Sequence, residues 1–171
     1  MENVLLGIYN ATNIREIEEI KEELIEEGYL KRNTKQTKIK KQKDSTPHHY
    51  LSSDGFHIYV GKNNKQNDYL TMKFANKNDL WLHVQNMPGS HVIIKLEGNN
   101  IPEATLNEAA LLAAYFSRGK NGNHIPVDYS EKKNVRKPKN AKPGMVVYDK
   151  FKTIFVNPTL DLVQKITKLE D

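Results

Sequence analysis

Apolar residues recur at two spacings along the chain, and the change between them separates predicted helices from predicted strands. Within residues 13–27 the apolar positions follow at steps of three, three and four, which places them on one stripe of a helix. These positions are Ile14, Ile17, Ile20 and Leu24. Residues 1–9 carry a second apolar cluster and look like the end of an earlier helix. Because such a stripe has little to pack on within this chain, we expect a C-terminal fragment of a longer protein.

The ends of the predicted helix carry recognisable signals. Thr12 or Asn13 can cap its first N–H groups, and Glu16 stands three residues after Asn13, as a capping box requires. Gly28 follows as the expected stop. The end signals and the periodicity therefore agree on one helix.

From residue 56 onward, large apolar and polar side chains alternate, which is typical of strands. We expect strands at residues 56–60, 70–74, 81–84, 91–95, 125–129, 145–148 and 153–156. After Pro102, residues 103–117 are rich in alanine and predict a helix that can lie close against a sheet. The predicted fold is α+β: a mainly antiparallel sheet covered by one long Ala-rich helix and preceded by an acidic helical segment.

Charge divides the chain into segments. Residues 1–30 hold eight Glu against two basic residues, residues 31–43 hold seven Lys and Arg and no acid, and the rest carries a balance of +4. We expect four parts: a helical region in residues 1–30, a basic linker in 31–49, a globular domain in 50–160 and a C-terminal tail in 161–171. The linker is open to two interpretations, a solvated spacer or an electrostatic arm for nucleic acid.

Composition excludes several classes of protein. The 171 residues include no cysteine, which rules out a disulfide scaffold, a thiolate zinc site and a cysteine nucleophile. No apolar run approaches the ~18 residues that a membrane-spanning helix needs, and the N-terminus lacks the order of a signal peptide. We therefore expect a cytoplasmic protein, with a net charge of +5, that has no membrane partner.

Two segments of the predicted domain could either bind a ligand or only shape turns. Residues 54–68 are dense in Gly, Asn, Gln and Asp, which can satisfy turn backbone or, beside Lys62 and Lys65, bind a nucleic-acid backbone. Residues 132–144 hold six basic residues and no acid. Because strands are expected on both sides of this basic run, its side chains are held in place and favour phosphate binding over simple solvation.

A third group of residues, Asp79, His83, Ser90 and His91, could suggest zinc binding or nucleophilic catalysis. The two histidines lack an HxH or HExxH spacing. Ser90 and His91, as neighbours in a strand, point to opposite faces and cannot easily form a hydrogen bond. We expect no metal site, no cofactor and no catalytic residue, and hence no enzyme.

Three stretches of this sequence resemble a known family. They occur in order within residues 50–158 and read DGFHIYVGKNNKQND, LTMKFANKNDLWLHVQNMPGSHVII and KKNVRKPKNAKPGMVVY. They are similar to the NFACT-R domain, the C-terminal RNA-binding domain of the NFACT family. That family includes bacterial RqcH-like and eukaryotic NEMF-like factors of ribosome-associated quality control, and some bacterial members are called fibronectin-binding proteins. The acidic helix looks like the last part of the family's middle coiled coil.

The resemblance implies a function and its partners. Family members bind the large ribosomal subunit that carries a stalled nascent chain, and they recruit tRNA so that an untemplated C-terminal tail, alanine in bacteria, is added. The implied role of this chain is to bind tRNA and the RNA of the large ribosomal subunit beside the N-terminal domains of the same parent protein. The rival from another class is an adhesion module that binds fibronectin or another extracellular matrix protein.

The candidate RNA-binding residues come from all three stretches. For phosphate contacts we expect Lys62, Lys65, Lys73, Arg136, Lys137 and Lys142, with Lys132 and Lys139 from the same basic run. We expect adaptable polar contacts from Asn63, Asn64 and Gln66. His83 and His91 are expected to lie beside the same surface.

Overall fold

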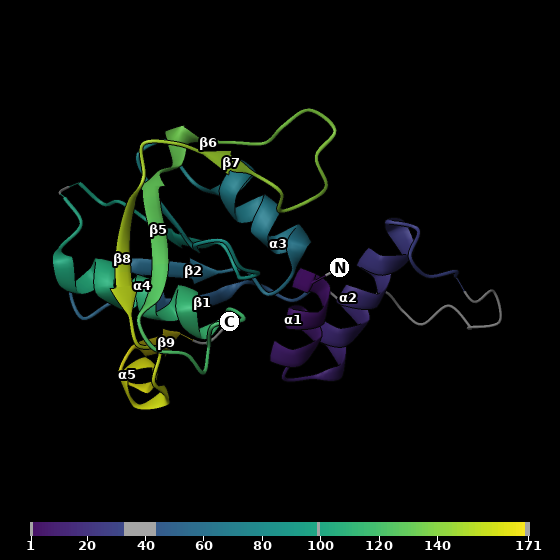
Figure 1. Ribbon diagram of the computed structural model, residues 1–171, viewed down its shortest axis with the longest axis horizontal. Coiled ribbons are helices and arrows are strands. Elements are labelled where there is room, and N and C mark those ends of the chain that lie inside the picture. The colour runs from purple at the N-terminus through teal and green to yellow at the C-terminus, as the bar shows by residue number, and fades with distance from the viewer. Residues whose placement is uncertain (1, 33–43, 99, 170–171) are drawn as a thin grey trace.

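The computed structural model describes residues 2–32, 44–98 and 100–169, and its centre is one antiparallel sheet. The sheet has seven strands in the order β8-β5-β3-β4-β2-β1-β9 (Figure 1). Their bounds are β1 His48–Leu51, β2 His57–Val60, β3 Leu80–Val84, β4 Val92–Ile94, β5 Ile125–Glu131, β8 Lys152–Val156 and β9 Thr167–Leu169. A separate two-stranded sheet consists of β6 Val135–Arg136 and β7 Val147–Tyr148. The prediction of a mainly antiparallel sheet is confirmed.

Short helices surround the sheet. The α-helices are α1 Glu2–Asn10, α2 Ile14–Glu26, α3 Asn64–Tyr69, α4 Glu103–Tyr115 and α5 Leu160–Gln164. A π-helical turn, η1 Leu70–Phe74, continues α3, and a 3-10 turn, η2 Lys132–Asn134, precedes β6. The α+β class is therefore confirmed.

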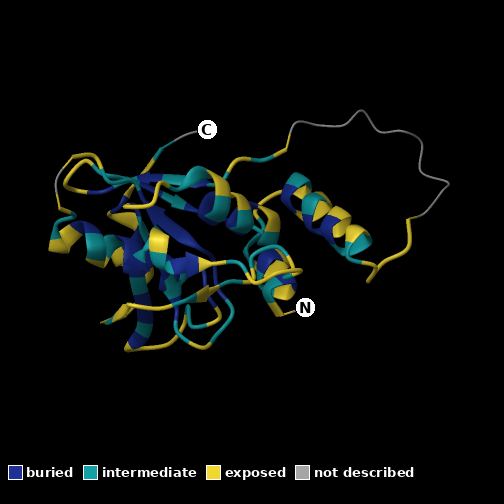
Figure 2. Ribbon diagram, turned by 90° about the horizontal axis from the view of Figure 1, so that it is seen from above, coloured by how far each residue is buried: buried dark blue, intermediate teal, exposed yellow. Residues whose placement is uncertain are grey.

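Alternating strand residues form a hydrophobic core on each face of the sheet, which Figure 2 shows as a buried centre. On one face, the strands pack against α4 through fully buried aliphatic side chains such as Ile58 and Leu82. On the other face, Trp81 and Ile93 pack against Leu70 of η1 and Val135 of β6. Both faces of the sheet are thus covered, which is the layered arrangement that buries apolar surface most completely.

The prediction of one long Ala-rich helix as the cover is not supported. The Ala-rich helix α4 has only 13 residues, and α5 lies beside it and adds Val163 to the same core. After α4 the chain turns, so that Ser117 forms a bridge with Gly89. The hydroxyl of Ser117 donates to the carbonyl oxygen of Ala114 over 2.6 Å and helps to close the end of the helix.

The strand predicted at residues 70–74 is wrong, because this segment is the π-helical turn η1. Leu70 and Phe74 alternate with polar residues, but they are also four residues apart, and that spacing puts both on one side of a helix. Both contact the core around Trp81 in this conformation. The residues predicted as a strand at 145–148 include β7, which pairs with β6 outside the main sheet.

The two N-terminal helices form a hairpin beside the sheet domain (Figure 1). The predicted cap is confirmed, since the side chain of Asn13 accepts a hydrogen bond from the backbone N–H of Glu16 over 3.0 Å. Gly28 has a φ of +81°, as the predicted stop requires. Of the predicted stripe, Ile20 is buried, whereas Ile14 is 75% exposed. The helix therefore uses only part of its apolar stripe against this chain.

Two strands lie at the margins of the predicted domain. β1 begins in the predicted linker 31–49 and ends in the predicted domain 50–160, and β9 lies in the predicted tail 161–171. They pair with each other, and β1 also pairs with β2, so both belong to the sheet. Residues 33–43 of the predicted linker lie outside the described part of the chain.

Candidate nucleic-acid interface

Three segments that lie far apart in the sequence meet along α3. The side-chain oxygen of Asn67 accepts a hydrogen bond from the backbone N–H of His91 over 3.1 Å, where the chain enters β4. The carboxylate of Asp68 accepts from the backbone N–H of Gly144 over 3.1 Å and from the amine of Lys137 over 2.8 Å. Both of these donors lie in the loop between β6 and β7. Helix α3 therefore fixes the positions of the other two segments.

The contact between β2 and α3 depends on a glycine. A Cβ atom at Gly61 would lie 1.9 Å from the side-chain oxygen of Asn67. Gly61 also donates its backbone N–H to the carbonyl oxygen of His91 over 3.1 Å. A larger residue at this position would push α3 away from the sheet and separate the three segments.

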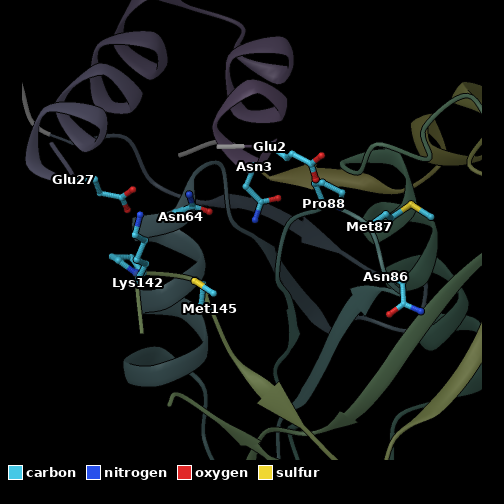
Figure 3. A pocket seen from close by; sticks show the side chains of 11 residues that line it. Glu2, Asn3, Glu27, Asn64, Asn86, Met87, Pro88, Lys142 and Met145 are labelled. Carbon is cyan, nitrogen blue, oxygen red and sulfur yellow. The ribbon is translucent and has the colours of Figure 1, made fainter. Parts of the chain in front are cut away.

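The amide side chains at the start of α3 are used inside the structure. Asn63 caps the helix by accepting from the backbone N–H of Gln66 over 2.8 Å. Gln66 accepts from the backbone N–H of Lys62 over 3.0 Å and donates to the carbonyl oxygen of Ser45 over 3.0 Å. The structure thus assigns Asn63 and Gln66 a structural role, while Asn64 borders a cavity (Figure 3).

Acidic side chains of α2 contact the first basic residues. The amine of Lys62 lies 3.2 Å from the carboxylate of Glu16, and the two side chains are only 11% and 7% exposed. Burial alone would raise the pKa of Glu16. Hydrogen bonds from Thr12 and Lys62 and the positive charge of Lys62 have a larger effect in the opposite direction, so the pKa of Glu16 lies below its ordinary value. Because Lys62 is covered and paired, a phosphate would have to displace Glu16 to contact it.

Lys65 is paired in a more open way. Its amine lies 2.9 Å from the carboxylate of Glu26, and both side chains are more than half exposed. The hydrogen bond that Lys65 donates to Glu26 raises the pKa of Lys65, so this lysine stays charged. Exposed pairs of this kind contribute only about 0–1 kcal/mol to stability. A phosphate can therefore compete with Glu26 for Lys65.

Of the two predicted histidines, His91 is buried and His83 is half-buried. His91 is 2% exposed, and its Nδ1 accepts a hydrogen bond from the indole N–H of Trp81 over 3.3 Å and contacts the hydroxyl of Thr71 at 2.7 Å. Burial and the neighbouring His83 lower the pKa of His91 to about 3. Burial also lowers the pKa of His83, whose Nδ1 contacts the carbonyl oxygen of Val84 at 2.6 Å. At neutral pH these rings are uncharged, and they supply no positive charge to a phosphate.

Two lysines of the basic run are tied to other segments. Lys137 is bound to Asp68 of α3, with side chains 29% and 22% exposed. The amine of Lys142 donates to the hydroxyl of Tyr29 over 2.6 Å and lies 4.7 Å from the centre of the same ring. The basic loop is thereby attached at two points, to α3 and to the segment after α2.

The remaining predicted cations are more accessible. Lys73 and Lys139 are exposed, and neither forms an ion pair within the described part of the chain. Arg136 is 70% exposed and lies 4.0 Å from the carboxylate of Asp149, the outer limit for an ion pair. Lys132 is half-buried in η2. These positions leave an open cationic surface along η1 and the loop between β6 and β7.

A cavity of about 440 Å³ lies where the N-terminal helices approach the three segments (Figure 3). Its lining combines residues from both helices, from the β3–β4 turn and from the basic loop: Glu2, Asn3, Glu27, Asn64, Asn86, Met87, Pro88, Lys142, Pro143, Gly144 and Met145. The lining includes two carboxylates and one lysine, so this cavity does not concentrate positive charge.

Sequence reasoning missed the carboxylates that pair with the first basic segment. Glu16, Glu19, Glu23 and Glu26 follow at steps of three, four and three, which places them on one side of a helix. That acidic stripe was visible in the sequence and could have indicated a basic partner. Tyr29, the partner of Lys142, gave no such signal, because the two residues are brought together only by the fold.

The described residues hold no group of three or more His, Asp or Glu side chains placed to bind a metal ion. Asp79 instead accepts from the amine of Lys95 over 2.6 Å and from the backbone N–H of Leu96 over 2.9 Å. Within the same ranges, no helix is both long enough and apolar enough to cross a membrane.

Comparison with known proteins places these three segments in one family. A family model described as the NFACT protein RNA binding domain matches residues 46–150. The chain belongs to this family. The matched range of the NFACT RNA-binding domain contains β1 to β7, α3, α4 and the whole basic loop.

The relatives are longer proteins. Rqc2 homolog RqcH from Bacillus subtilis (strain 168) is 48% identical over 166 residues, which cover 96% of this chain and 29% of that protein. Rqc2 homolog RqcH from Streptococcus suis (strain 05ZYH33) is 46% identical over 155 residues, which cover 90% of this chain and 27% of that protein. The chain therefore spans less than a third of the length of these relatives.

A solved structure is similar to the whole arrangement, including the N-terminal helices. It is the C-terminal part of the fibronectin/fibrinogen-binding protein from Streptococcus suis, with a TM-score of 0.87 and 43% sequence identity. The similarity covers 97% of this chain and 65% of that chain.

Proposed function

We propose that this chain is the RNA-binding part of a ribosome-associated quality-control factor and that it contacts tRNA or ribosomal RNA on the large subunit. The observation that carries the proposal is the match of the NFACT RNA-binding domain over residues 46–150. Two relatives that are 46–48% identical over most of this chain bear the name Rqc2 homolog RqcH, which supports the same setting.

The RNA contact is assigned to a surface that we call the cationic face, which consists of Lys65, Lys73, Arg136 and Lys139. All four side chains are exposed and lie on α3, η1 and the β6–β7 segment, which the contacts of Asp68 hold together. Exposed lysine and arginine side chains neutralise phosphates and release counterions, which is the main source of sequence-independent affinity for RNA. Lys62, Lys137 and Lys142 support this face by fixing its segments.

In the parent protein, the domain would bind and position RNA while the N-terminal domains of the same protein complete the site. It would thereby support the addition of untemplated alanine tails to nascent chains in the cytoplasm. The domain itself would catalyse no reaction. The buried position of His91, the lowered pKa of His83 and the structural contacts of Asp79 favour this role.

The proposal is tested with a variant that removes charge from the cationic face and keeps the contacts of Lys62, Lys137 and Lys142 that hold its segments. We expect Lys73→Gln, Arg136→Gln and Lys139→Gln, combined in one chain, to weaken binding of fluorescein-labelled tRNA. If these side chains make about three phosphate contacts, the slope of log K against log salt should become shallower by roughly 2. Fluorescence anisotropy at several salt concentrations measures both quantities.

The matched control carries Lys165→Gln and Lys168→Gln, two exposed lysines at α5 and β9. Figure 1 shows these elements at the opposite end of the domain from β6 and β7. An equal loss of log K for each charge removed in the two variants would show that only net charge matters and would remove the cationic face from the proposal.

A second candidate function is a protein-adhesion module. It is favoured by the similarity to the structure of a fibronectin/fibrinogen-binding protein from Streptococcus suis. Binding of this chain to immobilised fibronectin that persists at high salt, together with no binding to tRNA at low salt, would favour this candidate over RNA binding.

A further inference from the structure

One side of the helix formed by α3 and η1 presents an aromatic residue between two cations. Lys65, Tyr69 and Lys73 are exposed, whereas Gln66 and Leu70, which follow the first two in sequence, are buried. Residues four apart on a helix are neighbours on its surface. The three exposed side chains therefore form a continuous ridge, and Tyr69 lies in its middle.

The π-helical turn improves this alignment. In a regular α-helix with 3.6 residues per turn, positions eight residues apart diverge by about 80° around the axis. In η1 the backbone hydrogen bonds span five residues instead of four, and the N–H of Ala75 donates to the carbonyl oxygen of Leu70 over 2.9 Å. Because each turn then holds more residues, each residue turns through a smaller angle around the axis. Lys73 is thereby brought back toward the line that joins Lys65 and Tyr69.

The ring of Tyr69 is available to a ligand. Its side chain is 49% exposed, and its nearest aromatic neighbour is Phe74, with ring centres 6.1 Å apart and planes tilted by 35°. Nothing in the described part of the chain accepts or donates a hydrogen bond at its hydroxyl. A flat ring held on a rigid helix between two cations is the arrangement that proteins use to bind single-stranded nucleic acid.

We propose that Tyr69 stacks on one unpaired base of the RNA, while Lys65 and Lys73 contact the phosphates on either side of it. This inference rests on the proposed RNA-binding function and adds to it the kind of RNA that is bound, a single-stranded segment. In the free domain Lys65 forms an ion pair with Glu26. Because this pair is exposed, a phosphate can replace the carboxylate of Glu26 at little cost in free energy.

Stacking and charge contacts respond differently to salt, and the test uses that difference. The probe is a short fluorescein-labelled oligouridylate, compared with a blunt RNA duplex. We expect Tyr69→Ala to weaken binding of the oligouridylate about tenfold, within the range known for one stacked base, and to leave the salt slope unchanged. Tyr69→Phe should bind as the original chain does, and Lys65→Gln with Lys73→Gln should make the salt slope shallower.

The matched control is Tyr9→Ala, which removes another exposed tyrosine, 84% exposed, from α1. If the original chain binds the oligouridylate and Tyr69→Ala binds equally well, stacking is refuted and the RNA-binding function stands. An equal loss in Tyr69→Phe would assign the contact to the hydroxyl and would also refute stacking. If the original chain binds neither probe at low salt, the proposed function itself fails.

A direct readout complements the affinities. In a Tyr69→Trp variant the new indole lies on the ridge, whereas the native Trp81 is 1% exposed. Stacking of a base on the new indole should quench its fluorescence as the oligouridylate is added, and the duplex should quench it much less. Unchanged fluorescence at saturating oligouridylate would contradict the inference.

Discussion

Two buried residues show that position in the fold decides which titratable groups carry charge. His91 is uncharged at neutral pH because its ring is buried beside His83. Glu23 on α2 is 3% exposed, and one of its carboxylate oxygens, Oε1, has no hydrogen-bond partner. Burial, together with the nearby Glu27, raises the pKa of Glu23 to about 7, although hydrogen bonds from Asn64 act in the opposite direction.

The raised pKa of Glu23 predicts that stability falls as the pH rises. The pKa of Glu23 is 4.5 in the unfolded state and about 7 in the folded state, so the folded state holds the proton more tightly. The stabilisation that this proton provides is fully present below pH 4.5 and is lost as the pH rises through about 7. We expect Glu23→Gln to raise the thermal midpoint at pH 8 by a few degrees, corresponding to roughly 1 kcal/mol, and to have less effect at pH 5. Thermal unfolding at both pH values measures this difference.

Glu18→Gln serves as the control, since Glu18 is exposed on the same helix. An increase in the midpoint that is the same at both pH values, or that also occurs in the control, would show that Glu23 is not the titrating group.

At the scale of elements, the contact between α2 and α3 separates residues that sequence reasoning had grouped together. Lys62 and Lys65 both looked like candidates for phosphate binding, but only the fold shows that Lys62 is covered by Glu16 while Lys65 remains open. Loss of one member of a covered ion pair leaves the other charge without compensation, which costs more than loss of an exposed pair.

This difference predicts unequal effects of two substitutions on the same helix. Glu16→Gln should destabilise the docking of α2 by on the order of 2 kcal/mol, because Lys62 would remain covered and unpaired. Glu22→Gln breaks the exposed pair with Arg32, whose side chains are 67% and 53% exposed, and should have little effect. Amide hydrogen exchange along α2 measures docking directly. Equal exchange in the two variants would mean that the pair of Glu16 and Lys62 does not hold the helix.

The elements that sequence reasoning recovered are those with strong local signals. The cap at Asn13, the stop at Gly28 and the alternation in β2 are all encoded within a few residues. In segment 70–74 the alternation of apolar and polar residues predicts a strand, but Leu70 and Phe74 also have a helical spacing. Their tertiary contact with the core around Trp81 selects the helical conformation.

For the candidate site too, the sequence predicts some features, whereas others depend on the fold. The resemblance of three stretches indicated the NFACT RNA-binding family, and the family match confirms it. For Asn63 and Gln66 the sequence indicates two roles, satisfying turn backbone or binding RNA, and the fold shows the first. The buried position of His91 could not be predicted, because its contact with Trp81 forms only in the folded sheet. The sequence does not indicate Tyr69 as a binding residue, because its position between Lys65 and Lys73 depends on α3 continuing into η1, where the alternation predicts a strand.

At the scale of the whole molecule, charge is separated between two regions. The acidic N-terminal helices lie beside the domain, and α2 neutralises the basic residues at the start of α3. The other residues of the cationic face, Lys73, Arg136 and Lys139, lie on η1 and the β6–β7 segment and are left open to the surroundings. This separation orients the domain, because an approaching polyanion is repelled by the acidic side chains of α2 and attracted to the exposed cations of η1 and the β6–β7 segment.

The most direct test of the central claim is a lysine footprint of this 171-residue chain with tRNA at low salt. Acetylation of each lysine, measured by mass spectrometry with and without RNA, reports both binding and its location. We predict that RNA protects Lys73 and Lys139 and leaves Lys165 and Lys168 as reactive as before. If excess tRNA leaves the reactivity of Lys73 and Lys139 unchanged, or lowers that of all four lysines to the same extent, an RNA site on the cationic face is contradicted.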